Sequence, residues 1–201
     1  MKEHLEVTNH AKGLDLVASL VSKKPSQLTA KDLLSIHEVI LQEIDDEHAG
    51  NYRNVPVRIA GSTVVLPNPH KVPELIDDFH SWITGKHRLH PVQLAGEAHY
   101  RLVTIHPFVD GNGRTARLLM NLSLMMYGYP PAIIRKRDRL AYLGALEESQ
   151  GGTRAKFDKL IAAAANRSLD IYLKAVQLSP QSVIWTRIEF SRLENLRKLR
   201  M

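Results

Sequence analysis

The side chains best suited to chemistry lie in a single run, His106-Pro107-Phe108-Val109-Asp110-Gly111-Asn112-Gly113-Arg114-Thr115-Ala116-Arg117. Gly111 and Gly113 permit positive φ and leave no side chain between the backbone and a ligand. An apolar stretch suited to a helix, from Leu118 to Met126, follows at once. Because the free N–H groups of this loop would lie at a helix N-terminus, the run predicts an anion-binding site.

The polar side chains of the run can complete a site for a phosphate ester. Arg114 and Arg117 are three residues apart, so on a helix they share a face and can bind phosphate oxygens together. Asp110 is the kind of carboxylate that Mg²⁺ takes along with substrate phosphates. His106 can accept a proton from an attacking hydroxyl near neutral pH. Asn112 adds an amide that both donates and accepts. These parts together predict phosphoryl or nucleotidyl transfer.

Each part of the run, taken alone, is more often structural. A His-Pro pair is usually a turn, a Gly-Asn-Gly sequence a hairpin, and a helical pair of arginines a solvated face. Phe108 is itself best interpreted as a core residue that anchors the loop from below. Seven chemically suitable residues in one contiguous run that opens onto a helix reverse these odds and favour a functional site.

The run also resembles the signature of the Fic (filamentation) family, His-x-Phe-x-Asp/Glu-Gly-Asn-Gly-Arg-x-x-Arg, at every fixed position. Similar segments flank it at residues 89–91, 98–100, 118–121 and 128–131. The resemblance implies an all-α fold, a Fic-type helical bundle with one short β-hairpin flap. It covers roughly residues 5–175, about the size of one domain, and leaves residues 176–201 as a C-terminal helical tail.

The resemblance implies a protein adenylyltransferase, which transfers AMP from ATP to a Tyr, Thr or Ser hydroxyl of target proteins, with self-labelling, and releases pyrophosphate. His106 would be the catalytic base, and Asp110 would hold Mg²⁺. The Gly111–Gly113 loop and Arg114 would bind the α- and β-phosphates, and Arg117 the terminal phosphate.

Three positions bear on which nucleotide is used. A kinase-like branch of the family carries Lys where this chain has Gly113, so the glycine favours nucleotidyl transfer. In the family, the helix after the double proline helps to form the adenine pocket, where Tyr142 is placed to stack or bond. Gln150 occupies a position where the family often has Asn, near the end of that helix. Two alternatives remain open: transfer of another nucleotide or phosphate-containing group, and a non-catalytic nucleotide-binding regulatory module.

Residues 55–67 interrupt the helical pattern. Apolar residues alternate with Pro56 and Arg58, and a turn-like Ala60-Gly61-Ser62-Thr63 precedes a second apolar stretch, which predicts a short β-hairpin. Taken alone, the pattern is typical of a surface hairpin. In the Fic family this is the flap that pairs with an extended target segment. The residues expected to bind protein substrates there are Val57, Ile59, Val64 and Leu66.

The rest of the chain has a mostly helical pattern. Apolar spacing predicts helices over residues 6–21, 33–44, 74–84, 91–104, 135–148 and 153–173, and a terminal helix within 178–201. Thr29-Ala30-Lys31-Asp32 is a plausible N-terminus for the second of these helices. His90 and His99 are interpreted as structural, because no carboxylate lies near them at metal-ligand spacing.

Composition limits the class of protein. The 201 residues suit one domain, and a formal net charge of +6 suits a nucleotide or an acidic partner without predicting DNA binding. The basic cluster Arg135-Lys136-Arg137 with Arg139 is either a solvated helix start or a contact for phosphate or a partner. The absence of cysteine excludes disulfides and thiolate metal sites. No signal-like or membrane-spanning apolar run is present, so we expect a cytoplasmic protein without a membrane partner.

Most Fic proteins carry an inhibitory helix, Ser/Thr-x-x-x-Glu-Gly/Asn, whose Glu pairs with the second arginine of the motif. No Glu here completes that pattern, and residues 191–195 come closest, with a spacing one residue too short. Residues 3–16 resemble the segment that follows such a helix. We therefore expect Arg117 to be free for phosphate, and AMP transfer to be constitutive with poor deAMPylation. The inhibitory Glu would then come from a helix in a longer parent chain or from an antitoxin-like protein. A homodimer is also compatible with the sequence.

Overall fold

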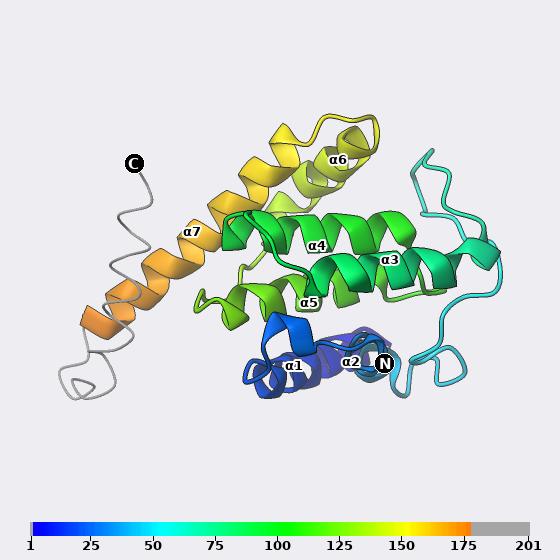
Figure 1. Cartoon of the computed structure of the whole chain (residues 1–201), viewed down its shortest axis with the longest axis horizontal. Helices are drawn as coiled ribbons and strands as arrows, with labels where there is room; N and C mark the ends of the chain where they lie inside the picture. The colour runs from blue at the N-terminus through cyan, green and yellow to red at the C-terminus, as the bar shows by residue number, and fades with distance from the viewer. Residues whose placement is uncertain (1, 178–201) are drawn as a thin grey trace.

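The computed structural model describes residues 2–177, which form seven α-helices connected by loops and three short 3₁₀ turns (Figure 1). The helices are α1 (Lys2–Leu20), α2 (Ala30–Leu41), α3 (Val72–Thr84), α4 (Pro91–Ile105), α5 (Asn112–Met126), α6 (Arg139–Gln150) and α7 (Ala155–Gln177). The predicted all-α class is therefore confirmed. The terminal helix predicted within 178–201 lies outside the described residues.

The helix starts follow from local chemistry. At the start of α2, Thr29 Oγ1 accepts from Asp32 N at 3.2 Å and Asp32 Oδ2 accepts from Thr29 N at 2.8 Å, so the predicted N-terminus is confirmed as a capping box. The predicted helix start at Arg135 was wrong by four residues. Residues Lys136–Asp138 form a 3₁₀ turn, across which Arg135 Nε pairs with Asp138 Oδ2 at 2.8 Å, and α6 begins at Arg139.

Helix α5 is the centre of the fold. It lies against α4 along its length and also contacts α1 and α2 (Figure 1). Its buried side chains point in all directions, which is what a helix enclosed by others requires. The largest fully buried ones are Leu118, Met120, Leu122 and Leu124. Burial of each contributes ~1.5–3 kcal/mol. This packing holds the N-terminus of α5, and with it the run at 106–117, in a fixed place.

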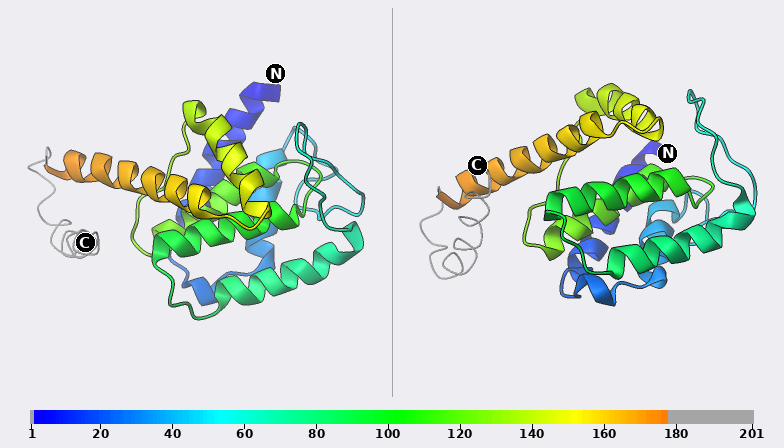
Figure 2. Two further views of the ribbon diagram at one scale, coloured as in Figure 1. Left: turned by 90° about the horizontal axis from the view of Figure 1, so that it is seen from above. Right: turned by 45° about the horizontal axis from the view of Figure 1, so that its top comes forward.

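The segment between α2 and α3 leaves the helical body and returns to it, and both views of Figure 2 show it as an extended loop beside the bundle. Its turn forms as predicted, with Ser62 N donating to Ile59 O at 3.1 Å and Gly61 at φ 77°. The predicted β-hairpin is not confirmed, because no residue from 2 to 177 is in a strand. An isolated two-stranded ribbon is marginal in water, and Pro56 lacks a donor for a ladder.

The alternation that predicted the hairpin nevertheless appears in the burial of the segment. The four residues expected to face a target are half-buried: Val57, Ile59, Val64 and Leu66. Their neighbours Arg58 and Val65 are exposed, Val65 to 93%. The segment thus keeps an extended, two-faced backbone without a strand partner.

Helix α7 packs on α4 and α6 and then runs beyond the bundle (Figures 1 and 2). Residues of α6 lie across one cavity from the start of α5 and the tip of the extended loop. No helix among residues 2–177 is long and apolar enough to cross a membrane.

Candidate active site

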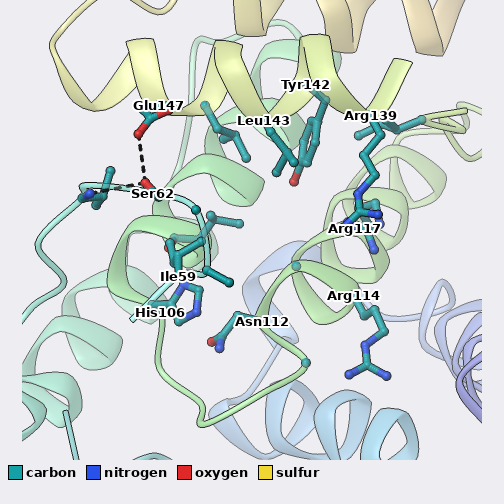
Figure 3. A pocket seen from close by; sticks show the side chains of 18 of the residues that line it. Ile59, Ser62, His106, Asn112, Arg114, Arg117, Arg139, Tyr142, Leu143 and Glu147 are labelled. Atoms are coloured by element: carbon teal, nitrogen blue, oxygen red, sulfur yellow. Dashed lines mark hydrogen bonds between the residues drawn. The ribbon is translucent and has the colours of Figure 1, made fainter. Parts of the chain in front are cut away.

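A cavity of about 630 Å³ lies between α6, the tip of the 55–67 segment and the start of α5 (Figure 3). It brings together most of the residues that the sequence singled out: His106, Asp110, Gly111, Asn112, Gly113, Arg114, Arg117, Tyr142, Gln150, Ile59 and Val64. Val57 and Leu66 do not line it. The volume is in the range of small-molecule sites.

His106 terminates α4 in an unusual backbone conformation, with φ 51° and ψ 58°. Pro107 follows it, so the helix cannot continue. The His106 N–H still donates to Leu102 O at 2.9 Å, and its Nδ1 lies 3.2 Å from Val103 O. Because a carbonyl only accepts, Nδ1 must carry the hydrogen and Nε2 keeps a lone pair. Burial lowers the pKa of His106 below 6.5, which favours this neutral, basic form.

The loop after His106 is closed by a side chain. Asn112 Oδ1 accepts from Phe108 N, and Asn112 Nδ2 donates to Phe108 O, both at 2.9 Å. The Asn112 amide is therefore committed to the loop, and of this residue only the backbone N–H could bind a ligand. Gly111, with φ 78°, precedes α5, whose first turn has no side-chain cap. An uncapped helix N-terminus can bind an anion through its N–H groups.

His37 of α2 supports the loop from below. Its ring stacks on Phe108 with centroids 3.6 Å apart, its Nδ1 accepts from Gly50 N at 3.1 Å, and its Nε2 lies 3.0 Å from Asp110 O. One nitrogen therefore accepts and the other donates, which only the neutral ring allows. Burial lowers the pKa of His37 to about 4, so the ring is neutral at physiological pH.

The two arginines of the run have different partners. Arg114 Nη2 lies 3.2 Å from Asp110 Oδ2, and Arg114 Nη1 lies 3.3 Å from Glu6 Oε1 of α1. No carboxylate within residues 2–177 pairs with Arg117, whose charge lowers the pKa of the nearby Tyr142 hydroxyl and opposes the effect of burial. In Figure 3 both guanidinium groups lie on the α5 side of the cavity.

Asp110 presents a half-exposed carboxylate to the cavity. Its Oδ1 accepts from Gly111 N at 2.6 Å, and its Oδ2 is 3.9 Å from Lys2 Nζ. Across residues 2–177, no group of three or more His, Cys, Asp or Glu side chains could hold a metal ion. A single carboxylate is still compatible with Mg²⁺, which completes its coordination with phosphates and water.

The two other histidines near the motif make structural contacts. His99 is fully buried beside Tyr142, whose hydroxyl lies 3.0 Å from His99 Nε2. His90 accepts from Val92 N at the start of α4, and its Nε2 lies 3.1 Å from the Tyr129 hydroxyl. Tyr142 therefore lines the cavity, while its hydroxyl contacts the buried His99.

Comparison with known proteins assigns the family. The Fic/DOC family profile matches residues 27–124. The structure of a Fic-domain-containing signaling protein from Bacteroides thetaiotaomicron is 30% identical, with a TM-score of 0.77, over 88% of this chain and 74% of that one. The chain belongs to the Fic/DOC family. Residues 134–508 of Fic-1 from C. elegans are 32% identical, with a TM-score of 0.80, over 88% of this chain and 53% of that one.

Curated Fic relatives are longer than this chain. The protein adenylyltransferase Fic of Drosophila virilis is 42% identical over 90% of this chain but only 37% of its own length. That of Drosophila melanogaster is 41% identical with the same coverage. The chain thus spans somewhat more than a third of the curated relatives that it matches, and their activity enters below as a proposal.

Sequence reasoning missed two residues that support the Fic/DOC motif. His37 had a usable signal, since it lies at a buried position of α2 among apolar residues, where a polar side chain needs partners. Arg53 had none, because it is a single basic residue in a polar loop. It is nevertheless 3% exposed and binds the His106 carbonyl.

The rim of the Fic/DOC cavity contains further charged residues. Of the basic cluster, Arg135, Lys136 and Arg139 line the cavity; Lys136 and Arg139 are exposed, and Arg135 is also paired with Asp138. Ser62, at the tip of the extended loop, donates to Glu147 of α6 at 3.0 Å (Figure 3). This bond joins the loop to α6 across the cavity mouth.

Proposed function

We propose that this chain is a protein adenylyltransferase that moves AMP from ATP to a Tyr, Thr or Ser hydroxyl of target proteins, itself included. Family membership and curated relatives named as protein adenylyltransferases support this activity. The observation that carries the proposal is the placement of His106 on the same cavity as Arg114, Arg117 and the uncapped start of α5. A binding module would need no base at this position.

The reaction forms one bond and breaks one. The acceptor oxygen attacks the α-phosphorus of ATP, and its proton passes to the Nε2 lone pair of His106. The bond from the α-phosphorus to the bridging oxygen breaks, and the electron pair leaves with pyrophosphate. The Val103 carbonyl keeps the ring in the required tautomer, and burial lowers its pKa, which favours the unprotonated form.

The N–H groups of Asn112 and Gly113, at the start of α5, and the two arginines supply positive charge for the phosphates. Arg114 is held by Asp110 and Glu6, whereas Arg117 has no carboxylate partner within residues 2–177. This supports the assignment of Arg117 to the terminal phosphate. Fixed donors of this kind stabilise the charge that develops on the transferred group. Tyr142 and Gln150 line the α6 side, where we place the adenine ring.

The half-exposed Asp110 carboxylate on the cavity wall fits a role as the protein ligand of Mg²⁺. When bound, the ion would neutralise phosphate charge and orient the leaving group. Arg114 and Lys2 lie near this carboxylate, at 3.2 Å and 3.9 Å from its Oδ2.

Residues 55–67 are the proposed binding site for protein substrates. The backbone is extended there, and no described residue pairs with it in a ladder, so its N–H and C=O groups can add a target strand. Ile59 and Val64 lie on the cavity, and Val57 and Leu66 lie farther along the same half-buried face. A target paired with this segment would have its hydroxyl next to His106.

The proposed domain boundaries are residues 5–175 for the Fic domain and 176–201 for a tail. The packing of α7 on α4 and α6 supports including it in the domain. Control by an inhibitory helix or an antitoxin-like protein, and a homodimer, remain predictions. An inhibitor of this type would act by supplying a carboxylate to Arg117.

Mass spectrometry of the chain incubated with ATP and Mg²⁺ tests the proposal. We expect a mass gain of one AMP and incorporation of label from α-labelled ATP. His106→Ala should abolish both, while the control His70→Ala should not, because His70 is exposed and does not line the cavity. Competition with UTP, GTP and CDP-choline identifies the donor.

Two results would contradict the assignment. Equal labelling of the His106→Ala variant would exclude His106 as the base. Absence of Mg²⁺-dependent labelling, with ATP binding retained, would instead favour the regulatory-module alternative.

A further inference from the structure

Arg53 is a buried cation without a counter-ion. Its side chain is 3% exposed, and within residues 2–177 no carboxylate pairs with it. Burial lowers the pKa of its guanidinium below the usual value. A buried charge without a counter-ion is costly. The hydrogen bonds of the Arg53 guanidinium must therefore offset this cost.

The guanidinium of Arg53 is bonded entirely to backbone carbonyls. Its Nε donates to His106 O at 2.7 Å, its Nη1 to Val55 O at 3.1 Å, and its Nη2 to Pro67 O at 2.7 Å. Its own backbone N–H donates to Pro107 O at 2.8 Å. One planar group therefore reaches three separate stretches of chain.

These three stretches belong to the proposed target-binding segment and to the proposed catalytic base. Val55 and Pro67 are the two ends of the 55–67 segment, at which it leaves the helical body and rejoins it. His106 carries the proposed base in a strained conformation at the end of α4. No ladder joins the two arms of the segment to each other, and Arg53 donates a hydrogen bond to each of their ends.

We propose that Arg53 is a positioning residue that fixes the target-binding segment relative to the catalytic histidine. The inference rests on the proposed function for the roles of these two parts, but the contacts themselves do not depend on it. Because Arg53 does not line the cavity, it acts through its neighbours and not on the nucleotide. The rigid fork of an arginine suits three diverging acceptors, and the single ammonium of lysine does not.

The Arg53 charge has a second consequence. The charged groups that face His106 are Arg53, which lowers its pKa, and Asp110, which raises it. Removal of the guanidinium should therefore raise the pKa of His106, while a lysine in its place should largely preserve it. The two variants separate the charge of Arg53 from its geometry.

The test compares Arg53→Gln, Arg53→Lys and the control Arg88→Gln, an exposed arginine away from the cavity, in the full chain. We expect ATP affinity to stay within about twofold, while the rate of AMP self-labelling falls ~10–100-fold in both Arg53 variants, since small misplacements of reacting groups cost this much. The control should match the parent. A thermal melt of each variant confirms that it folds.

Backbone NMR provides a readout that does not need catalysis. Order parameters of residues 55–67 should fall toward the flexible range, below ~0.6, in both Arg53 variants. The His106 titration should move to higher pH in Arg53→Gln only. If the parent chain fails to label, the proposed function fails, and the NMR data still decide whether Arg53 holds the segment.

Unchanged order parameters in folded Arg53→Gln would overturn the inference. So would a loss of labelling matched by an equal loss of ATP affinity, because that pattern indicates general damage to the fold. Full labelling activity in Arg53→Lys would show that charge alone suffices and would also overturn the positioning role.

Discussion

Gly111 and Gly113 are only two residues apart, but their replacement by alanine should have opposite effects on the stability of the fold. Gly111 has φ 78°, where an alanine costs ~1–2 kcal/mol. A Cβ there would also lie 3.2 Å from the His37 ring and 3.3 Å from Ile40 Cγ2, both of which are buried and cannot move freely. We expect Gly111→Ala to lose roughly 2–3 kcal/mol in total, since overpacking adds to the backbone term.

Gly113 is the matched control. It lies within α5 with helical φ, and a Cβ would meet only Arg117 Nη1, at 3.4 Å. Alanine is favoured over glycine in a helix, so Gly113→Ala should gain ~0.5 kcal/mol. For a chain of this size these changes correspond to a Tm lowered by roughly 4–12 °C for Gly111→Ala and raised by about 1–2 °C for Gly113→Ala.

Thermal unfolding followed by circular dichroism measures both shifts, and AMP self-labelling measures their effect on the site. Gly111→Ala should reduce labelling at least about tenfold, because the displaced loop no longer aims its N–H groups at the phosphates. A gain in Tm for Gly111→Ala, or shifts of the same sign in both variants, would refute the assignment of strain and contact at Gly111.

Three further predictions concern polar contacts. Asn112→Asp should destabilise the chain at neutral pH by about 2–4 kcal/mol, because a carboxylate oxygen then faces the buried carbonyl that Asn112 Nδ2 binds, and the loss should shrink in acid as the carboxyl protonates. His37, with its folded pKa lowered to about 4, contributes stability that is present above pH 6.5 and lost as pH falls, so the advantage of the parent over His37→Gln in urea unfolding should shrink by up to about 3 kcal/mol between pH 6.5 and 4. Ser62→Ala should change stability by less than about 0.5 kcal/mol but lower NMR order parameters around Ser62, whereas Glu147→Gln, which keeps an acceptor, should not.

Each of these has a clear opposing outcome. A pH-independent deficit for Asn112→Asp would mean that the contact with the Phe108 carbonyl is not what the variant disrupts. A constant difference between the parent and His37→Gln across the acid range would mean that His37 does not titrate as a buried neutral ring. Order parameters that stay high in Ser62→Ala would show that another contact holds the loop tip to α6.

The motif and the helices could be predicted from the sequence because their signals are local. The residues from His106 to Arg117 are contiguous, and a loop that opens onto a helix brings its own groups together whatever surrounds it. Apolar periodicity likewise predicted the helices, and the boundary of α6 failed only where a short ion pair favoured a 3₁₀ turn over an extra helical turn. The alternation at 55–67 predicted two faces, but a ladder also needs a partner strand, which the pattern did not contain.

The tertiary structure alone decided how the motif is held and enclosed. His37 and Arg53 lie far from His106 in the chain, and their bonds to Asp110 and His106 carbonyls exist only because α2 and the loop after it pack beneath the motif. The same packing assigns the Asn112 side chain to Phe108 and leaves its N–H for a ligand. Sequence by itself determined which groups could do the chemistry, since residue types and short spacings are local. Their orientation, tautomers and shared cavity depend on buried contacts between distant segments, which no local pattern encodes.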